Sequence, residues 1–356
     1  MHTGNNTQPA PHRLAVTYAF DDPPEEGTGL EVAPGVFWLR MPLPFALDHI
    51  NLWLLEDGEG FTIVDTGIAR DEVKSAWRTL FSGLMSGRSV KRVVSTHFHP
   101  DHFGLAGWLT EILDAPLWMT RSEWLTGSML FADADGRASK AQVALFRKHG
   151  LDDARLQALA ERGNAYRRVL TTPPSSYRRI VEGERLTVDG CDWTVIVGRG
   201  HAPEHACLYC ADKSVLISGD QVLPKISPNV SLSATEPEAD PLSEYLESLD
   251  RLATLPEDVL VLPSHDFPFY GLCARIKALK NHHAERLDRL ADHCQTPRTA
   301  AETLEVLFRR RLDAHQIMFA MGESLSHLMH LEAKGRVVRH IGADGISRFA
   351  ANSAKA

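Results

Sequence analysis

A run of ten residues, from Ser95 to Gly104, holds three histidines and an aspartate within six positions. These are His97, His99, Asp101 and His102, and they follow an apolar stretch typical of a buried strand. Histidines two apart at a strand end can face one cavity, while the other two side chains begin the next helix. Zinc binds nitrogen and carboxylate donors in a compact shell, so the run is a candidate metal site.

Three further polar residues stand directly after predicted strands. His201 follows Gly198-Arg-Gly200, Asp220 follows Ser218-Gly219, and His265 follows Pro263-Ser264. Each one alone would more often be a turn residue or a helix cap. A layered α/β fold gathers its active site at strand ends, so the three residues and the histidine cluster together complete a set for two metals.

Strands and helices alternate along most of the chain, which predicts an α/β layered architecture. The expected strands are 36–40, 51–56, 60–65, 91–96, 177–188, 193–197, 206–210, 215–218 and 259–262, and the expected helices are 71–84, 103–113 and 241–255. The stretch from Arg121 to Arg168 has helical periodicity and almost no strand signal, so we interpret it as a helical insertion.

Three regions are predicted from these patterns. Residues 1–28 form a flexible polar tail without the features of a secretory signal, which indicates a cytoplasmic protein. Residues 29–270 form the catalytic domain, with the insertion at about 121–168, and 259–262 as its last strand. Residues 271–356 form a small helical module that ends in a hairpin, the winged-helix pattern, with a helix opened by Thr299 and Glu302 at capping-box spacing.

The composition is that of an ordinary globular protein, with 44% hydrophobic and 24% charged residues and no apolar run long enough to span a membrane. A formal net charge of −8 argues mildly against nucleic acid as the main partner, because phosphate binding needs a positive face. The five cysteines are scattered, so no disulfide framework is expected. Cys207 and Cys210 form a C-x-x-C, but residues three apart on a strand point to opposite faces, which predicts buried free thiols.

The motifs together resemble the metallo-β-lactamase superfamily. Val64-Asp65-Thr66-Gly67 is similar to its upstream aspartate motif, and the segment from Gly200 to His205 resembles the Gly-His-x-Pro-x-His segment of its hydroxyacylglutathione hydrolase (glyoxalase II) branch. The resemblance implies an αββα sandwich, with Asp65 outside the ligand shell and His205 structural. It also implies a first metal held by His97, His99 and His201, a second metal held by Asp101, His102 and His265, and Asp220 as the bridge.

Such a centre would be a hydrolase site. Two adjacent cations lower the pKa of a bridging water towards neutrality, and the hydroxide attacks a carbonyl or phosphoryl centre. We expect Asp101 and Asp220 to be the catalytic carboxylates, with Asp101 as the proton acceptor. Two Zn²⁺ ions are the favoured cofactors, although Mn²⁺ or Fe²⁺ also accept such ligands.

The glyoxalase II-like segment favours a small acyl thioester or ester as substrate. The alternatives are a single-stranded RNA endonuclease, because lactamase-beta-like relatives with a similar extension cleave RNA, and a lactonase. A mononuclear iron dioxygenase and a β-lactamase are less favoured.

The C-terminal module and the loops fit several different roles. A basic patch of 309–311 with Lys334, Arg336 and Arg339 would suit RNA, but nearby acids dilute its charge and a solvated surface is favoured. The module can instead cover the active site or form a homodimer contact. The loops 42–49 and 224–232 and the insertion can border the metals. Candidate pocket walls, weighed against ordinary loop packing, are Phe45, His49 and Trp124.

Overall fold

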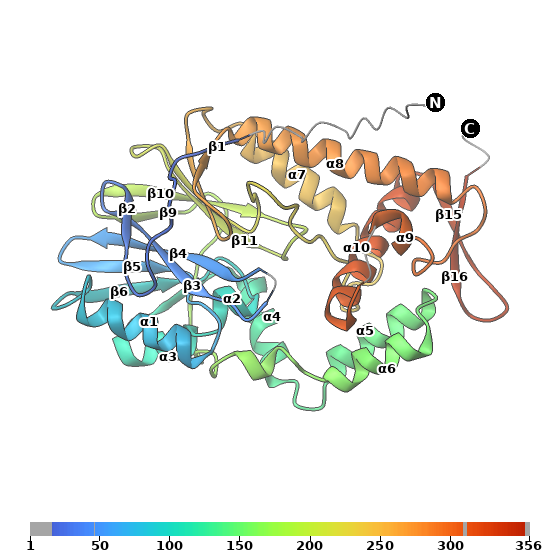
Figure 1. Ribbon diagram of the computed structural model, residues 1–356, viewed down its shortest axis with the longest axis horizontal. Coiled ribbons are helices and arrows are strands. Elements are labelled where there is room, and N and C mark those ends of the chain that lie inside the picture. The colour runs from blue at the N-terminus through green and yellow to red at the C-terminus, as the bar shows by residue number, and fades with distance from the viewer. Residues whose placement is uncertain (1–15, 46, 309–311, 353–356) are drawn as a thin grey trace, which may run out of the picture.

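Two seven-stranded sheets face each other, and helices cover both outer faces (Figure 1). This is the α/β sandwich of αββα type that the sequence predicts. The computed structural model describes residues 16–45, 47–308 and 312–352. The first sheet has the order β2-β3-β4-β5-β6-β7-β8, and the second has the order β1-β14-β13-β12-β11-β10-β9.

Asp65, His97, Asp220 and His265 each follow a strand that runs parallel to a neighbour near the centre of its sheet. In the first sheet β5 pairs in parallel with β6, and β6 with β7; in the second, β12 pairs in parallel with β13. Parallel neighbours end at the same edge of a sheet, so Asp65 and His97 leave the first sheet close together, and Asp220 and His265 leave the second sheet close together. The strands are β1 Thr17–Tyr18, β2 Leu30–Ala33, β3 Val36–Pro42, β4 His49–Asp57, β5 Gly60–Val64, β6 Ser89–Val94, β7 Leu117–Met119, β8 Arg178–Arg179, β9 Arg185–Val188, β10 Cys191–Gly198, β11 His205–Cys210, β12 Val215–Gly219, β13 Leu260–Pro263 and β14 Phe269–Tyr270.

Three hydrophobic clusters correspond to the three interfaces of the sandwich. The cluster between the sheets contains Trp38, Trp53 and Trp193, all with at most 1% of their surface exposed. Helices α1 (Asp71–Ser82) and α3 (Ala106–Leu113) cover the first sheet and belong to the second cluster. Helices α7 (Pro241–Leu252) and α8 (Leu272–His293) cover the second sheet, and α10 (Ala314–Ala333) packs against both helices; all three belong to the third cluster.

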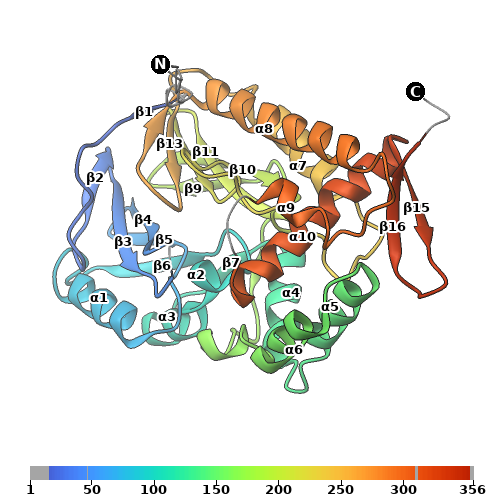
Figure 2. The same ribbon diagram turned by 45° about the vertical axis from the view of Figure 1, so that its right-hand side comes forward.

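The predicted insertion is helical, as expected, and it packs against the C-terminal part of the chain. It consists of α4 Arg121–Ala132, α5 Arg137–Lys148, α6 Asp153–Arg162 and the short 3-10 helix η1 Arg167–Val169. Helices α5 and α6 lie below α10 in Figure 2, and the third hydrophobic cluster runs from Leu145 on α5 to Phe349 on the C-terminal hairpin. The hairpin, β15 Val337–Ile341 and β16 Ser347–Ala351, follows the helices as predicted. The segment predicted as a separate module therefore shares its core with the sandwich.

Several predicted boundaries differ from the structure. Residues 1–15 of the predicted tail lie outside the described residues, but Thr17–Tyr18 forms β1 against β14, so that part of the tail prediction is wrong. The strand expected to be the last of the catalytic domain, β13, is followed by β14, which pairs with both β13 and β1. Thr299 and Glu302 exchange the predicted capping hydrogen bonds, yet they open a turn, and α9 (Leu304–Leu307) begins later.

The helix expected at 103–113 is divided into α2 (Pro100–Phe103) and α3, with Gly104 and Leu105 between them. The backbone at Gly104 passes so close to Gly67 that a Cβ there would lie 2.7 Å from the Gly67 carbonyl oxygen. Tertiary contact therefore decides this boundary, and the periodicity alone does not reveal it. No helix among the described residues is both long and apolar enough to cross a membrane.

Candidate metal centre

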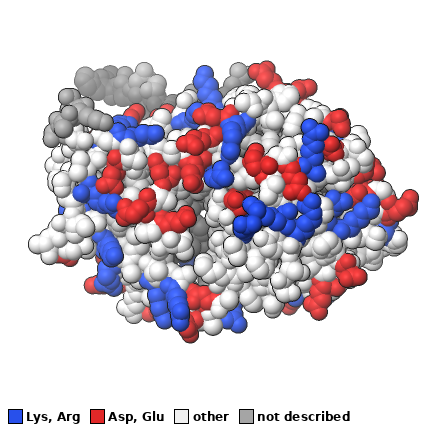
Figure 3. Space-filling view, turned by 180° about the vertical axis from the view of Figure 1, so that it is seen from behind, with Lys and Arg blue, Asp and Glu red and all other residues white. Residues whose placement is uncertain are grey.

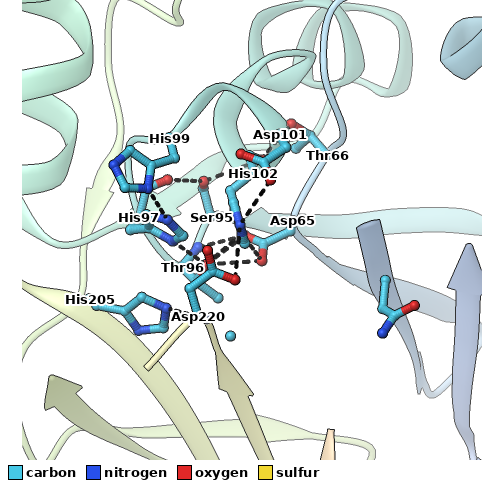
Figure 4. A network of polar contacts seen from close by, with 12 residues as sticks. Asp65, Thr66, Ser95, Thr96, His97, His99, Asp101, His102, His205 and Asp220 are labelled. Atoms are coloured by element: carbon cyan, nitrogen blue, oxygen red, sulfur yellow. Dashed lines mark hydrogen bonds and ion pairs between the residues drawn. The ribbon is translucent and has the colours of Figure 1, made fainter. Parts of the chain in front are cut away.

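The histidine cluster lies on the turn between β6 and α2. Pro100 occupies the first position of α2, where its missing N–H costs nothing and its fixed φ suits the helix. The turn directs His97 and His99 to one side, and the start of α2 carries Asp101 and His102 (Figure 4). The short helix thus splits four potential ligands into two pairs.

The first group consists of His97, His99, His201 and Asp220. One donor atom from each lies within 4.8 Å of all the others. His97 Nε2 is 2.9 Å from His99 Nδ1 and 3.3 Å from His201 Nε2, and His201 Nε2 is 3.4 Å from Asp220 Oδ2. Three imidazole nitrogens and a carboxylate oxygen converging in this way form a shell that a divalent cation such as zinc accepts.

The second group consists of Asp101, His102 and His265, whose donor atoms also lie within 4.8 Å of one another. Asp101 Oδ2 is 3.7 Å from His102 Nε2 and 3.5 Å from His265 Nε2. All seven residues predicted as metal ligands are therefore brought together, in the two sets that the family resemblance implies.

Asp220 lies between the two groups. Its Oδ2 faces His201, while its Oδ1 is 3.6 Å from His102 Nε2 and 3.4 Å from His265 Nε2. His102 Nε2 and Asp220 Oδ1 are buried, and neither makes a hydrogen bond within the described part of the chain. Buried polar atoms without partners are costly, so these two orphaned atoms fit a cation held between Asp220 and the second group.

Asp65 and Thr96 fix the ring of His102 from behind. Asp65 Oδ2 lies 2.8 Å from His102 Nδ1, and the other carboxylate oxygen accepts from the Thr96 N–H at 2.7 Å (Figure 4). Because a carboxylate accepts the Nδ1 proton, His102 presents Nε2 as a free lone pair towards the second group. Asp65 therefore lies behind the ligand shell, as the resemblance implies.

Two backbone carbonyl oxygens orient the rings of His265 and His201, the two histidines of the centre that lie outside the 97–102 cluster. His265 Nδ1 donates to the His49 carbonyl oxygen at 2.9 Å, and His201 Nδ1 donates to the Asn229 carbonyl oxygen at 2.8 Å. In each case the Nε2 atom is left to face the centre.

The two groups differ in their protonation. Burial lowers the pKa of His97 well below its ordinary value, and it lowers that of His99 to about 3. In the second group burial acts in the same direction, but the surrounding carboxylates outweigh it: they raise the pKa of His265 to about 10 and that of His102 well above its ordinary value. Burial thus favours the neutral form of His97 and His99, which a cation needs, whereas Asp101 and Asp220 favour positive charge in the second group, which a bound cation would supply in place of a proton.

His205 and Cys207 have the structural roles expected of them. His205 is fully buried, and its Nε2 accepts from the Asp220 N–H at 3.1 Å. On β11 the Cys207 side chain joins the third hydrophobic cluster, while Cys210 points to the opposite face, between the sheets. The C-x-x-C therefore forms no shared site.

The candidate pocket walls do not all face the centre. Trp124 stacks on Tyr177 with ring centroids 4.6 Å apart and donates to the Pro174 carbonyl oxygen, which is ordinary packing. His49 supports His265 through its backbone, and Phe45 is 47% exposed. Sequence reasoning missed Glu123, Tyr166 and Asn229, which contact the ligand loops, because nothing in their local spacing distinguishes them from ordinary insertion or loop residues.

A comparison with protein families decides the assignment. Residues 46–265 match the metallo-beta-lactamase superfamily, and residues 287–352 match the metallo-beta-lactamase-like C-terminal domain. The chain belongs to the metallo-β-lactamase superfamily. It is a metallo-hydrolase of that superfamily, whose members bind divalent metals, and it carries the His/Asp cluster for them.

Individual relatives agree with this metallo-β-lactamase assignment. A beta-lactamase domain protein from Burkholderia ambifaria has a similar structure, with a TM-score of 0.88, 46% sequence identity, and coverage of 94% of this chain and 98% of that one. The probable metallo-hydrolase YqjP of Bacillus subtilis is 25% identical over 86% of this chain and 94% of its own length. The human acyl-coenzyme A thioesterase MBLAC2 is 24% identical over 73% of this chain and 83% of its own length. These relatives do not single out the glyoxalase II branch.

Proposed function

We propose that this protein hydrolyses acyl thioesters of small molecules with two bound divalent cations, preferably zinc. The observation that carries the proposal is the pair of ligand groups sharing Asp220. The thioester is preferred among carbonyl substrates because of the Gly-His-x-Pro-x-His segment and because a relative covering most of the chain is an acyl-coenzyme A thioesterase.

Within this proposal His97, His99 and His201 hold one cation, Asp101, His102 and His265 hold the other, and Asp220 contributes to both. Cations bound there would lower the pKa of a water molecule and polarise the thioester carbonyl. Asp101, whose side chain is 20% exposed, accepts the proton from the attacking water at its carboxylate. As the C–O bond forms and the C–S bond breaks, that proton passes to the departing thiolate, which leaves a carboxylic acid and a thiol.

Within this proposal the acyl chain would occupy an apolar cavity on the far side of Phe98 and Tyr166 from the first ligand group. Its volume is about 240 Å³, and it lies between the insertion and α10 with walls that include Leu130, Phe146, Leu159 and Met318. The seven ligand residues do not line it, but Tyr166 does, and the Tyr166 hydroxyl donates to the Phe98 carbonyl oxygen at 2.5 Å. Phe98 and Tyr166 therefore separate the cavity from His97 and His99, and a long acyl chain enters it only when these two side chains move aside.

Two polar side chains of the cavity wall form hydrogen bonds with the wall itself. Gln142 bonds the backbone of residues 232 and 234, and Asn164 donates to the carbonyl oxygens of Leu130 and Asp133. Because these groups are satisfied, the cavity presents mainly apolar surface, which suits an alkyl chain.

The surface charges give less support to an RNA substrate. Arg336 pairs with Asp288, and Arg339 pairs with Glu238 and Glu332, so two members of the predicted basic patch are neutralised. The part of the patch at 309–311 lies outside the described residues. On the face seen from behind, Lys and Arg lie among Asp and Glu (Figure 3).

The experiment is a substrate panel with purified, metal-loaded protein. We expect chelator-sensitive release of free thiol from acyl-coenzyme A thioesters, with kcat/KM rising roughly fourfold per added methylene for the first few carbons. Ala234→Leu, which narrows the cavity, should lower kcat/KM for decanoyl but not acetyl thioester, while Ala132→Leu on the exposed side of α4 should change neither. Cleavage of a short single-stranded RNA or a cephalosporin, without any thioester cleavage, would overturn the proposal.

A further inference from the structure

Glu123 is a buried carboxylate that the mechanism does not use. It lies in the first turn of α4 with no measurable exposure. Its spacing from Thr120 is that of a capping box, in which it would accept from the backbone at the start of its own helix. No side-chain capping bond forms there, and the carboxylate instead points away from its helix.

The two oxygens of Glu123 contact two different ligand loops. Oε2 accepts from the Phe98 N–H at 2.9 Å, and Oε1 accepts from the Glu204 N–H at 2.6 Å. Phe98 lies between His97 and His99, and Glu204 lies between His201 and His205. One side chain therefore links the two loops that supply all three histidines of the first group.

Further contacts hold the same assembly together. The Tyr166 hydroxyl holds the next peptide unit of the same loop by donating to the Phe98 carbonyl oxygen at 2.5 Å. The Glu204 carboxylate accepts from the Ser122 N–H at 2.8 Å, and its carbonyl oxygen accepts from the Thr120 hydroxyl at 2.7 Å. A buried carboxylate is tolerated only when its hydrogen bonds are satisfied. Loss of the Phe98 or Glu204 N–H as a partner of Glu123 therefore costs free energy.

We infer that Glu123 is a positioning residue for the first metal site: it fixes the distance between the His97–His99 loop and the His201 loop, with Tyr166 as its helper. The second site does not depend on it, because His102 and His265 are oriented by Asp65 and the His49 carbonyl. Removal of Glu123 therefore affects one metal site and spares the other.

The test is a zinc titration of metal-free protein against a competing chelator, which resolves two affinities and needs no substrate. For Glu123→Gln, which keeps one strong acceptor instead of two, we expect one affinity to fall by roughly 10–100-fold and the other to stay unchanged. Tyr166→Phe should weaken the same site to a smaller degree. Glu111→Gln, an exposed carboxylate on α3, should change nothing.

Two results would overturn the inference. Both zinc sites in Glu123→Gln and Tyr166→Phe could keep their wild-type affinities, which would make the contacts mere packing. Both sites could instead weaken together with a fall in Tm, which would mean that Glu123 acts through the stability of the whole fold. If Glu123→Gln does not fold, Tyr166→Phe, which loses only one hydroxyl group, decides between these outcomes.

Discussion

The two halves of the metal centre are supported by different parts of the molecule. The second group is oriented by residues of the sandwich itself: Asp65 at the end of β5 orients His102, and the His49 carbonyl at the start of β4 orients His265. The first group is held by segments outside the sandwich. Glu123 and Tyr166 of the insertion bind its loop, and the Asn229 carbonyl orients His201. The sandwich thus builds one site by its own geometry, whereas the other depends on segments that lie outside it.

The first group also depends on helix α10 in the C-terminal part of the chain. The loop that carries Asn229 lies against α10, since the Leu232 N–H donates to the Gly322 carbonyl oxygen at 3.0 Å. Gly322 approaches this loop so closely that a Cβ would lie 2.6 Å from Ser231 Oγ. The position of His201 is therefore connected to the packing of α10 through two short steps.

The largest expected effect comes from the residue that belongs to both halves. Asp220→Ala should weaken both zinc sites and lower turnover by far more than the roughly 10–100-fold typical of residues that only support a ligand. Metal content after dialysis and kcat for the best thioester measure this. Asp212→Ala, an exposed carboxylate on the turn after β11, is the control. A variant at position 220 that keeps two tightly bound metals would remove Asp220 from the centre.

A change at Asp65 should affect the second half alone. In Asp65→Asn the amide can donate to His102 Nδ1, so the ring would carry its proton on Nε2 and could no longer offer that atom to a cation. We expect one zinc affinity to fall by roughly 10–100-fold, and it should be the one that Glu123→Gln leaves intact. Loss of the same site in both variants would erase the distinction between the halves.

A smaller effect is expected from α10. In Gly322→Ala the new methyl group must displace Ser231, which moves the loop that holds His201. Alanine favours a helix over glycine by about 1 kcal/mol, so a loss of zinc affinity in spite of this gain would identify the loop as the cause. The expected loss is several-fold at the first site only. Unchanged affinity at both sites would show that α10 does not control His201.

The last prediction concerns the stability of the C-terminal helices in acid and leaves the metal centre itself unchanged. His283 on α8 and His327 on α10 are fully buried, with His283 Nδ1 3.1 Å from His327 Nε2. Burial, together with His282 and Arg286 nearby, lowers the pKa of His283 to about 2 and that of His327 to about 3. Unfolded histidine titrates near 6.5, so the unfolded chain binds more protons below that pH and stability falls as the pH is lowered.

The measurement is the free energy of urea unfolding of the metal-free protein between pH 7.5 and 5. We expect this pair to contribute a loss of about 1.4 kcal/mol per pH unit for each proton taken up below pH 6.5. A double variant, His283→Leu with His327→Leu, should show a correspondingly shallower loss. Equal slopes for the variant and the wild type would mean that the pair does not contribute to acid sensitivity.

The two halves of the centre also differ in how much of each the sequence could predict. The seven residues predicted as ligands stand next to strand ends, so spacing and the family motifs were enough to predict the residues that the structure brings together in two groups. Asp65 was predictable for the same reason, because its motif lies beside the end of β5.

The residues behind the first group could not be predicted. Glu123 looks like a capping-box residue of its own helix, and its two partners lie 25 and 81 residues away along the chain. The carbonyl of Asn229 carries no side-chain signal at all. The shared core between the insertion and the C-terminal helices was missed for a related reason, since helical periodicity shows that a face is buried but not what it is buried against.

The most direct test of the two-site account is anomalous diffraction from crystals of the zinc-loaded protein. The account predicts two zinc peaks, one within bonding distance of His97, His99 and His201 and one within bonding distance of Asp101, His102 and His265, with Asp220 between them. A single peak, or peaks that are not bound by these residues, would contradict it.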